Sequence, residues 1–458
     1  MKAVKPSIPK GTRDFGPNEV RQRNFLFDTI RKVFVRYGFE PIETPSMENL
    51  VTLTGKYGEE GDQLLFKVLN NGNYLNKADK DALDARDSER LLFSICKRGM
   101  RYDLTVPFAR FVVQHQNDLS FPFKRYQIQP VWRADRPQKG RYQEFYQCDV
   151  DVIGTDSLMC EAELIQIYDE VFAALNLGVA IRLNNRNILE GVAEYCGYPD
   201  KTTEISMSID KLDKMKDGWA GVCRELEQRG IPADAHSAIE EALNAEGLDE
   251  LEKLFANSEV GQKGIAELRT VLRYLETYNM SNKLVVDFKL ARGLSYYTGC
   301  VFEVVVDTSI ESQKDIKMGS IGGGGRYADL TDMFGLKNMS GVGVSFGAER
   351  IFDVMEELNL FPESTADRTQ VLFIALDEES HFSAFETVYK LRQAGINAEL
   401  YPAAVKMKKQ MKYANARQVP FVAIVGENER NNGTVALKTM ATGEQVTLDW
   451  DALLAALQ

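Results

Sequence analysis

Two stretches of the chain place apolar residues at the i, i+3, i+4, i+7 spacing of a buried helix face. The first covers residues 19–37 and the second covers residues 161–177. The segment FEPIETPSME follows the first stretch, and its Pro41 and Pro45 would confine a strand to a sheet edge or an interface. The pattern therefore predicts two amphipathic helices and, after the first of them, an extended edge segment.

Residues 124–153 read as two β-patterned arms joined by a short loop rich in Arg, Lys and Gly. In the second arm, alternation places Phe145, Gln147, Asp149 and Asp151 on one face and Tyr146, Cys148, Val150 and Val152 on the other. The loop adds guanidinium groups, whose planar forks match phosphate oxygens, at Arg133, Arg136 and Arg141. Such a hairpin would suit a small zwitterion beside a polyphosphate. The alternative is a solvated hairpin with ordinary surface charges.

The character of the chain changes along its length. From about residue 198 to 282, charge is high and short helical patterns replace strand patterns, which predicts a helical insertion. Strand patterns return at 283–307. Residues 363–368 combine Ser, Thr and charged residues without periodicity, which indicates a linker. We therefore expect a core over residues 1–362, interrupted by the insertion, and a separate unit over residues 369–458.

The unit after the linker alternates strands with helices, which favours an α/β fold with a mostly parallel or mixed sheet. Its expected strands are VLFIAL, NAELY and FVAIVG, separated by two helical segments. The second helical segment carries a basic patch without any acidic residue, formed by Lys406, Lys408, Lys409, Lys412 and Arg417. Because phosphate contacts dominate RNA affinity, this patch is a candidate nucleic-acid contact.

Composition narrows the classes of function. The chain has 458 residues and 44% apolar content, and no apolar run reaches the ~18 residues of a membrane span. The N-terminus lacks the apolar stretch of a secretory signal and the six cysteines form no CxxC pair, so we expect reduced thiols and a cytoplasmic protein. The three histidines lack metal-ligand spacing, which argues against a zinc site and a Ser–His–Asp hydrolase. A net charge of −12 argues against generic DNA coating but leaves a local RNA contact open.

Other polar positions are candidate ligand contacts. Asp103 and Thr105 in RYDLTVPFAR fall on one face of an expected strand and could hold an ammonium group; the alternative is a strand end with a capping Asp. Gln147 and Asp151 share a strand face with their backbones ~13 Å apart, so side chains leaning inward could bracket an amino acid.

A second candidate set lies in ARGLSYYTG, where Arg292 precedes an expected strand that carries Tyr296 and Tyr297. Adjacent strand residues point to opposite sides, so at most one tyrosine faces a given pocket. The alternative role for the other tyrosine, or for both, is packing.

Two glycine runs resemble nucleotide-binding loops only superficially. Gly322–Gly325 is followed by Arg326 rather than Lys-Ser/Thr, so it is not a Walker A loop. The run 341–347 sets its third glycine one place late for GxGxxG, and no acidic residue follows on a second strand, which excludes a dinucleotide fold. These glycines would instead let a nucleotide base lie close to the backbone. Arg350, which opens the next helix, could stack on or pair with that nucleotide; the alternative is a helix-surface arginine.

Four segments together resemble the histidyl-tRNA synthetase family, a class II aminoacyl-tRNA synthetase family: RYDLTVPFAR, VWRADRP…GRYQEFYQCDVDVIG, ARGLSYYTG and GVGVSFGAERI. ARGLSYYTG is similar to the histidine-specific signature, and the hairpin and the GxGxxxGxER element resemble motifs 2 and 3. The segment around Pro45 resembles motif 1, a dimer-interface element. The resemblance covers nearly the whole chain.

The resemblance implies an α+β fold: a catalytic core with an antiparallel six-stranded sheet, a helical insertion and a C-terminal α/β anticodon-binding domain. It also implies a homodimer. The implied activity is ATP-dependent ligation of L-histidine to tRNA(His) through a histidyl-adenylate, with release of pyrophosphate and AMP. Mg²⁺ would bridge the outer phosphates of ATP. Two other readings remain open: a catalytically silent paralogue that senses histidine or tRNA, and a plain RNA-binding protein.

The resemblance also assigns roles to individual residues. It gives Asp103, Thr105 and Gln147 to the ammonium end of histidine, and Asp151 with one of Tyr296 and Tyr297 to the imidazole. It gives Arg133 to the α-phosphate and carboxylate, Arg292 to the vicinity of the α-phosphate, and Arg141 and Arg350 to the outer phosphates and the adenine side. Arg133 and Arg292 are thus the expected catalytic residues. Many members of the family carry Glu where this chain has Asp103 and Asp151.

Overall fold

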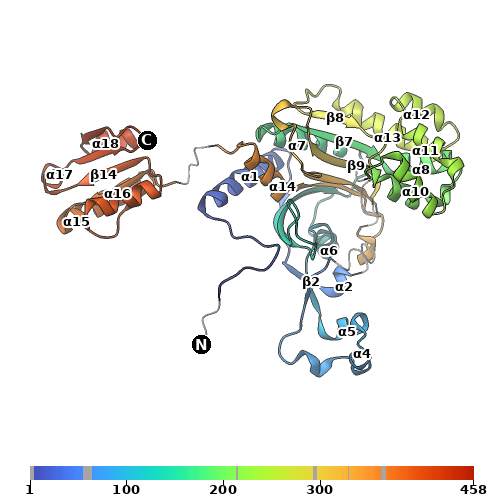
Figure 1. Ribbon diagram of the computed structural model, residues 1–458, viewed down its shortest axis with the longest axis horizontal. Helices are drawn as coiled ribbons and strands as arrows, with labels where there is room; N and C mark the ends of the chain where they lie inside the picture. Colours follow the sequence, from blue (N-terminus) through green and yellow to red (C-terminus); the bar gives the residue numbers. More distant parts are fainter. Residues whose placement is uncertain (1–4, 55–63, 213–214, 292–296, 329, 363–367) are drawn as a thin grey trace. The chain divides into compact units, whose positions relative to one another are not determined.

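The computed structural model describes residues 5–54, 64–212, 215–291, 297–328, 330–362 and 368–458. The chain forms two compact units, Met1–Phe361 and Pro362–Gln458, each with its own hydrophobic core (Figure 1). No helix among the described residues is long and apolar enough to span a membrane.

The first unit is built on an eight-stranded sheet whose inner six strands are all antiparallel. The two edge strands pair in parallel with their neighbours, and Pro41 lies on one of them, as the sequence predicts. This arrangement confirms the expected α+β fold with an antiparallel central sheet. In spatial order the strands are β1 (Glu40–Pro41), β5 (Phe123–Trp132), β6 (Glu144–Ile153), β11 (Gly341–Gly347), β10 (Gly322–Tyr327), β9 (Tyr297–Val306), β7 (Val179–Asn185) and β8 (Lys283–Val286).

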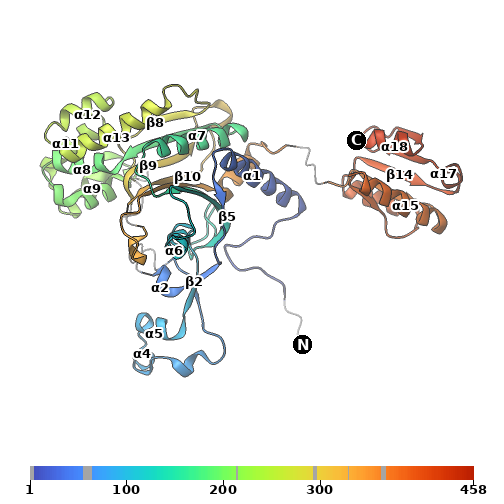
Figure 2. The ribbon, with the colours of Figure 1, turned by 180° about the vertical axis from the view of Figure 1, so that it is seen from behind.

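Helices cover both faces of this sheet (Figure 2). On one face, α1 (Pro17–Arg36), α7 (Met159–Ala174) and α14 (Ala348–Glu357) bury their apolar stripes in the main core. The helices α1 and α7 confirm the two predicted amphipathic helices. On the other face, α6 (Thr105–His115) packs through Phe108 and Val112 into a smaller core with Tyr327.

The start of α6 corrects one prediction. The sequence pattern placed Asp103 and Thr105 on a strand, but β4 (Arg98–Met100) ends before them and Thr105 begins the helix. Pro107 is compatible with the first helical turn, where a backbone N–H has no helical partner. Asp103 Oδ1 accepts a hydrogen bond from the Val106 N–H at 3.3 Å, which caps that turn.

A small three-stranded sheet precedes α6, in the order β2 (Met47–Asn49), β4 and β3 (Lys67–Val68). Short helices surround it: α2 (Leu50–Leu53), α4 (Lys80–Asp84), α5 (Ser88–Ile95) and the 3-10 helix η1 (Tyr74–Lys77). Two further 3-10 helices belong to connections of the large sheet: η5 (Glu311–Gln313) lies in the segment that joins β9 to β10, and η6 (Asp332–Phe334) in the segment that joins β10 to β11.

The predicted helical insertion lies between β7 and β8 and begins with α8, before the expected residue 198. Glycines allow the backbones of α8 and α13 to approach closely: a Cβ atom added to Gly191 would lie only 2.8 Å from the Gly261 Cα. The elements are α8 (Arg186–Tyr195), η2 (Pro199–Lys201), α9 (Thr202–Ile209), α10 (Trp219–Gln228), η4 (Ala233–Ala235), α11 (His236–Leu243), α12 (Leu248–Leu254) and α13 (Glu259–Leu275).

The second unit is a mixed five-stranded sheet flanked by helices, which confirms the predicted α/β fold. The three predicted strands pair in parallel, and two antiparallel strands that the sequence pattern missed extend the sheet. In spatial order the strands are β13 (Ala398–Leu400), β12 (Val371–Ala375), β14 (Phe421–Val425), β15 (Val435–Thr439) and β16 (Gln445–Leu448). The helices are α15 (Glu378–Gln393), α16 (Met407–Ala416), α17 (Glu427–Asn432) and α18 (Trp450–Leu457).

Candidate active site

Two adjoining cavities lie on the α6 face of the large sheet. Four residues line both of them: Arg133, Gln147, Gly323 and Ser345. The larger cavity, of about 410 Å³, is also lined by Asp135, Gly140, Arg141, Tyr142, Phe145, Glu349 and Arg350. The smaller cavity, of about 200 Å³, is also lined by Asp103, Thr105, Asp149, Asp151, Tyr297, Tyr327 and Gly343.

The alternation predicted for the second hairpin arm is confirmed on β6. Cys148, Val150 and Val152 are buried in the core beneath α1 and α7. Gln147, Asp149 and Asp151 point to the opposite side and line the smaller cavity. Strand pleating thus presents one amide and two carboxylates to the same small space.

Asp151 lies at a buried end of this row and both of its oxygens have partners. Arg125 Nη2 on β5 lies 2.7 Å from Oδ2, and the Tyr327 hydroxyl donates to Oδ1 at 3.0 Å. The Arg125 guanidinium is fully buried, 4.2 Å from the ring centroid of Phe108. Burial raises the pKa of Asp151, and the Arg125 charge opposes that rise. Position 343 on β11 must be glycine, because a Cβ atom there would overlap Oδ1 of Asp151.

Asp149, the middle residue of the row, is also buried. Its Oδ1 atom has no hydrogen-bond partner among the described residues. The pKa of Asp149 is raised to about 7: burial is the largest cause, and the nearby charges of Asp151 and Asp103 also raise it. Arg125 and a hydrogen bond from Ser345 lower it. The same Ser345 hydroxyl accepts from Gln147 Nε2 at 3.1 Å, which connects Gln147 to Asp149.

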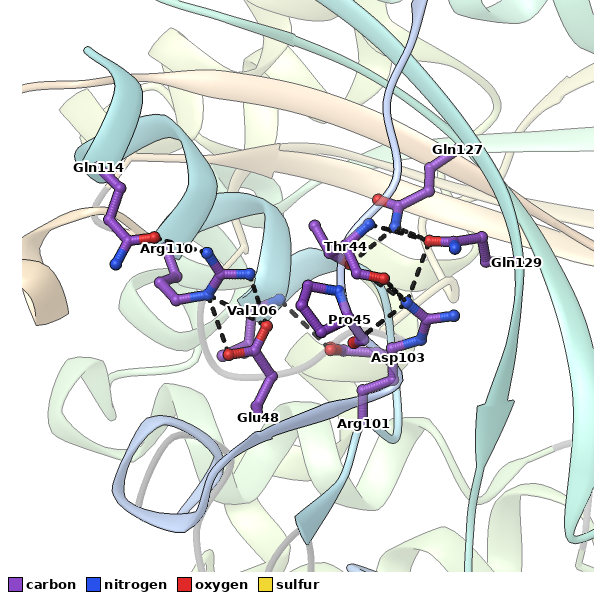
Figure 3. Close-up of polar contacts among 10 residues, drawn as sticks. All are labelled: Thr44, Pro45, Glu48, Arg101, Asp103, Val106, Arg110, Gln114, Gln127 and Gln129. Carbon is purple, nitrogen blue, oxygen red and sulfur yellow. Dashed lines mark hydrogen bonds and ion pairs between the residues drawn. The ribbon is translucent and has the colours of Figure 1, made fainter. Parts of the chain in front are cut away.

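The start of α6 brings Asp103 and Thr105 to the smaller cavity, and a polar network fixes that start (Figure 3). The buried Arg101 guanidinium donates to the backbone oxygens of Thr44 at 2.5 Å and Pro130 at 2.9 Å. Further along α6, Arg110 forms a two-pronged ion pair with Glu48, with contacts of 2.6–3.0 Å. The segment around Pro45 and strand β5 are thereby tied to the helix that carries Asp103 and Thr105.

Three arginines line the larger cavity. Arg133 donates from Nε to the Tyr102 carbonyl at 2.8 Å, with its guanidinium 5.2 Å from the Phe145 ring centroid. Arg141 is half exposed and lies 3.6 Å from Asp135. Arg350, at the start of α14, donates to the carbonyl oxygens of Gly140 and Ser320 at 2.7 and 2.6 Å. Arg350 therefore holds the hairpin loop as well as lining the cavity, and is not a simple helix-surface arginine.

The remaining predicted residues of the first unit are placed only in part. Tyr297 opens β9 and lines the smaller cavity. Arg292 and Tyr296 lie outside the described residues. Arg136, the third arginine of the loop, is exposed and is not among the residues that line either cavity.

Four residues of the smaller cavity and its wall were not singled out from the sequence: Arg125, Asp149, Tyr327 and Ser345. Alternation did place Asp149 on the polar face, and the same signal exists in KRYQIQP, where Arg125 and Gln127 alternate with apolar residues. Tyr327 and Ser345 carry no local signal, because they reach the cavity only through the pairing of β10 and β11.

In the second unit, the predicted basic helix is α16. Its buried side is held by Gln410, whose Nε2 donates to the Ala375 carbonyl at 2.8 Å. The basic patch lies on the exposed side and at both ends of the helix, with exposed side chains at Lys406, Lys408, Lys409, Lys412 and Arg417.

An antiparallel sheet that carries an arginine-lined cavity beside a smaller carboxylate-lined one, followed by a separate α/β unit, defines a class II aminoacyl-tRNA synthetase. The family model described as histidyl-tRNA synthetase matches residues 88–351, and the model described as anticodon binding domain matches residues 370–458. The chain belongs to the histidyl-tRNA synthetase family.

Individual relatives agree with this assignment. The histidine–tRNA ligase of Christiangramia forsetii is 53% identical, and the match covers 100% of both chains. A solved histidyl-tRNA synthetase from Nostoc is 31% identical, with a TM-score of 0.82 and 99% of each chain covered. A Bacillus halodurans structure titled "ATP phosphoribosyltransferase regulatory subunit/histidyl-tRNA synthetase" is 20% identical with a TM-score of 0.72, and shares the fold.

Proposed function

We propose that the chain catalyses ATP-dependent ligation of L-histidine to tRNA(His) in two steps, through a histidyl-adenylate. The observation that carries this proposal is the pair of adjoining cavities that meet at Arg133 and Gln147. One is the size of an amino acid and lined by carboxylates; the other is larger and lined by arginines. Family membership and the full-length ligase relatives support the same reaction.

Histidine occupies the smaller cavity in this proposal. Asp103, Thr105 and Gln147 bind its ammonium group, because a carboxylate, a hydroxyl oxygen and an amide oxygen can all accept hydrogen bonds from it. The carboxylates of Asp149 and Asp151 add negative charge nearby. Asp151 and one of Tyr296 and Tyr297 bind the imidazole. The presence of Tyr297 on the cavity wall supports Tyr297 as that tyrosine.

ATP occupies the larger cavity. Arg133 lies where the cavities meet, so it binds both the α-phosphate and the histidine carboxylate. Arg141 and Arg350 bind the outer phosphates and the adenine side, and Gly322 and Gly323 leave the backbone accessible to the base. Arg292, whose role rests on the family signature, acts beside Arg133 at the α-phosphate.

The first step is an in-line attack of the histidine carboxylate on the α-phosphorus, which expels pyrophosphate. Positioning and neutralisation of the developing negative charge supply the rate enhancement, so no protein nucleophile is needed. Arg133 is suited to this task because its fork binds two oxygens at once, and Tyr102 and Phe145 hold its orientation.

Mg²⁺ accompanies the triphosphate in this proposal. A magnesium ion bound mainly by phosphate oxygens and water needs only one or two protein carboxylates. Two carboxylates line the larger cavity, Asp135 and Glu349; Glu349 is held in ion pairs with Arg13 and Arg23, so Asp135 is the residue that would hold the ion. When bound there, the ion would offset phosphate charge.

In the second step, the terminal ribose hydroxyl of tRNA attacks the adenylate carbonyl and releases AMP. The basic patch on α16 binds the tRNA phosphates, supported by its exposure and by the match to an anticodon binding domain.

We further propose a cytoplasmic homodimer. The segment that resembles motif 1 and the start of α2 expose large apolar side chains, Met47 and Val51, at 42% and 68% exposure. Exposed apolar surface of this kind is typical of protein interfaces. The cytoplasm is the compartment in which charged tRNA is consumed.

The Bacillus halodurans structure, whose title names a regulatory subunit as well as a synthetase, shares this fold, so the fold alone does not separate a silent paralogue from the enzyme. The arginines Arg133, Arg141 and Arg350 at the cavity, and the second unit, favour the enzyme.

Histidine-dependent ATP–pyrophosphate exchange tests the proposal. We expect exchange that requires histidine and is not supported by the other amino acids, followed by histidine transfer to tRNA(His). Absence of exchange in the folded full-length protein would exclude the enzyme, and binding of histidine without exchange would identify the silent paralogue.

A further inference from the structure

Asp149 lies on β6 between Gln147 and Asp151 and lines the smaller cavity, but the family assignment gives it no role. The residue is only 3% exposed, and its Oδ1 atom has no hydrogen-bond partner in the described part of the chain. A buried polar atom without a partner is costly, so a ligand that donates a hydrogen bond there recovers free energy on binding.

The surroundings of Asp149 come from both neighbouring strands. Ser345 on β11 and Gln127 on β5 lie directly opposite it. The Ser345 hydroxyl hydrogen-bonds the carboxylate, whereas Gln127 donates its amide N–H groups to Thr44 Oγ1 and Gln129 Oε1. In the part of the chain that the structure describes, the charged and titratable groups around the cavity and behind it are Asp103, Arg125, Arg133, Asp151, Tyr168, Tyr297 and Tyr327.

A ligand N–H group that donates a hydrogen bond to Asp149 would favour the ionised form of its carboxyl group. Asp151 is engaged by Arg125 and Tyr327, whereas the Asp149 Oδ1 atom has no partner among the described residues. Among the described residues, the three carboxylates Asp103, Asp149 and Asp151 face the guanidiniums of Arg125 and Arg133. Because burial raises the pKa of Asp149 to about 7, the carboxyl is partly protonated near neutral pH.

We propose that Asp149 is a further histidine-binding residue, whose Oδ1 accepts a hydrogen bond from an N–H group of the bound amino acid. The inference rests on the proposed function. The bound state requires the carboxylate, so a protonated Asp149 loses its proton to solvent when histidine binds. Histidine affinity therefore rises with pH as Asp149 ionises, and it falls as pH drops through that range.

Asp149→Asn tests this directly, because Asn has the shape of the protonated carboxyl and cannot ionise. We compare kcat/KM for histidine in pyrophosphate exchange, for the wild type and the variant, from pH 6 to 8.5. The wild type should exceed the variant by about tenfold at pH 8.5, the worth of one hydrogen bond to a charged group, and by about twofold or less at pH 6. The KM for ATP should stay within about twofold.

The ratio of the two proteins isolates Asp149, because titration of the substrate's own imidazole affects both equally. If Asp149 only holds Ser345 in place, the ratio is independent of pH, and that result overturns the proposal. Ser345→Ala provides a second measurement, since the hydroxyl lowers the pKa of Asp149. Its pH profile should have a midpoint at higher pH than the wild type, and an unchanged midpoint contradicts the inference.

A competitive inhibitor separates the two possible donors. 3-(Imidazol-4-yl)propionate carries the imidazole but no ammonium group. If its inhibition weakens in Asp149→Asn, the donor is the imidazole; if only histidine binding weakens, the donor is the ammonium. Failure of the proposed function would appear differently, as a wild type without histidine-dependent exchange at any pH.

Discussion

The guanidinium of Arg13 lies over the ring of Tyr142, with its central carbon 3.6 Å from the ring centroid. Arg13 also forms ion pairs with Glu349 and with Asp353, the latter at 3.2 Å. Tyr142 and Glu349 both line the larger cavity. Nearby, the Gln143 N–H donates to the Gly11 carbonyl at 2.8 Å. The N-terminal segment therefore fastens the hairpin loop to α14, the helix that carries Arg350.

Arg13→Ala should weaken ATP binding, because the guanidinium that contacts both Tyr142 in the hairpin loop and Glu349 on α14 is removed. We expect the KM for ATP to rise about five- to thirtyfold, which corresponds to about 1–2 kcal/mol, with the KM for histidine within about twofold. Pyrophosphate exchange with each substrate varied in turn measures both. Arg31→Ala is the matched control, since Arg31 also lies in the N-terminal region and its ion pair among the described residues is with Asp28, on the exposed side of α1. Equal effects on the two substrates would contradict a role confined to the loop.

Asp151→Asn should raise the KM for histidine strongly with little change for ATP, because a site that hydrogen-bonds a polar ring discriminates through that bond. The substitution also leaves the buried Arg125 without its counterion, so the melting temperature should fall. The double variant Arg125→Met/Asp151→Asn removes that unpaired charge. It should recover stability but not histidine affinity. A normal KM for histidine in the stable double variant would show that a residue other than Asp151 binds the imidazole.

Arg292 is expected to act in the transition state, so its loss should reduce kcat more than it changes KM. Arg292→His should lower kcat for exchange by about 10²–10³, the usual effect of removing one charge-stabilising donor. Arg292→Lys keeps the charge but not the fork and should fall between this variant and the wild type. Arg224→Lys, at an exposed arginine of the insertion, is the control. A change below about threefold for Arg292→His would exclude the catalytic role.

Because the two compact units have separate cores, we expect amino acid activation to reside in the first unit and tRNA binding to depend on the second. Residues 1–362 should retain pyrophosphate exchange and charge tRNA poorly. In the full chain, replacing Lys406, Lys408, Lys409 and Lys412 with alanine should raise the KM for tRNA and reduce its salt dependence, without changing exchange. Equal charging by the truncated and full-length proteins would refute this, provided that both are folded and have the same oligomeric state.

Much of the site was predictable from local sequence. The period-two pattern of β6 was sufficient to place Gln147, Asp149 and Asp151 on one face, because strand pleating fixes side-chain direction residue by residue. The loop composition indicated a phosphate site, and ARGLSYYTG with the other motifs indicated the family. The order of predicted strands and helices gave the two units, because hydrophobic periodicity is a local property.

Contacts between residues distant in the chain decided those features of the site that local sequence patterns did not predict. Asp103 and Thr105 were expected on a strand, but packing of α6 through Phe108 and capping by Asp103 favoured a helix there. Arg125 became the counterion of Asp151 only because β5 and β6 pair in a register that sets those two residues opposite each other. Such register joins residues that are distant in the chain, and no local pattern specifies it.

The sequence by itself determined the family, the division into two units and the chemical type of most residues in the site. The tertiary structure decided that those residues meet in two adjoining cavities, with Arg133 between them. It also decided the ionisation of Asp149, since the pKa of a carboxyl depends on burial and on neighbours such as Arg125 that only folding brings near. Residue type is local, whereas desolvation and charge proximity are properties of the assembled sheet.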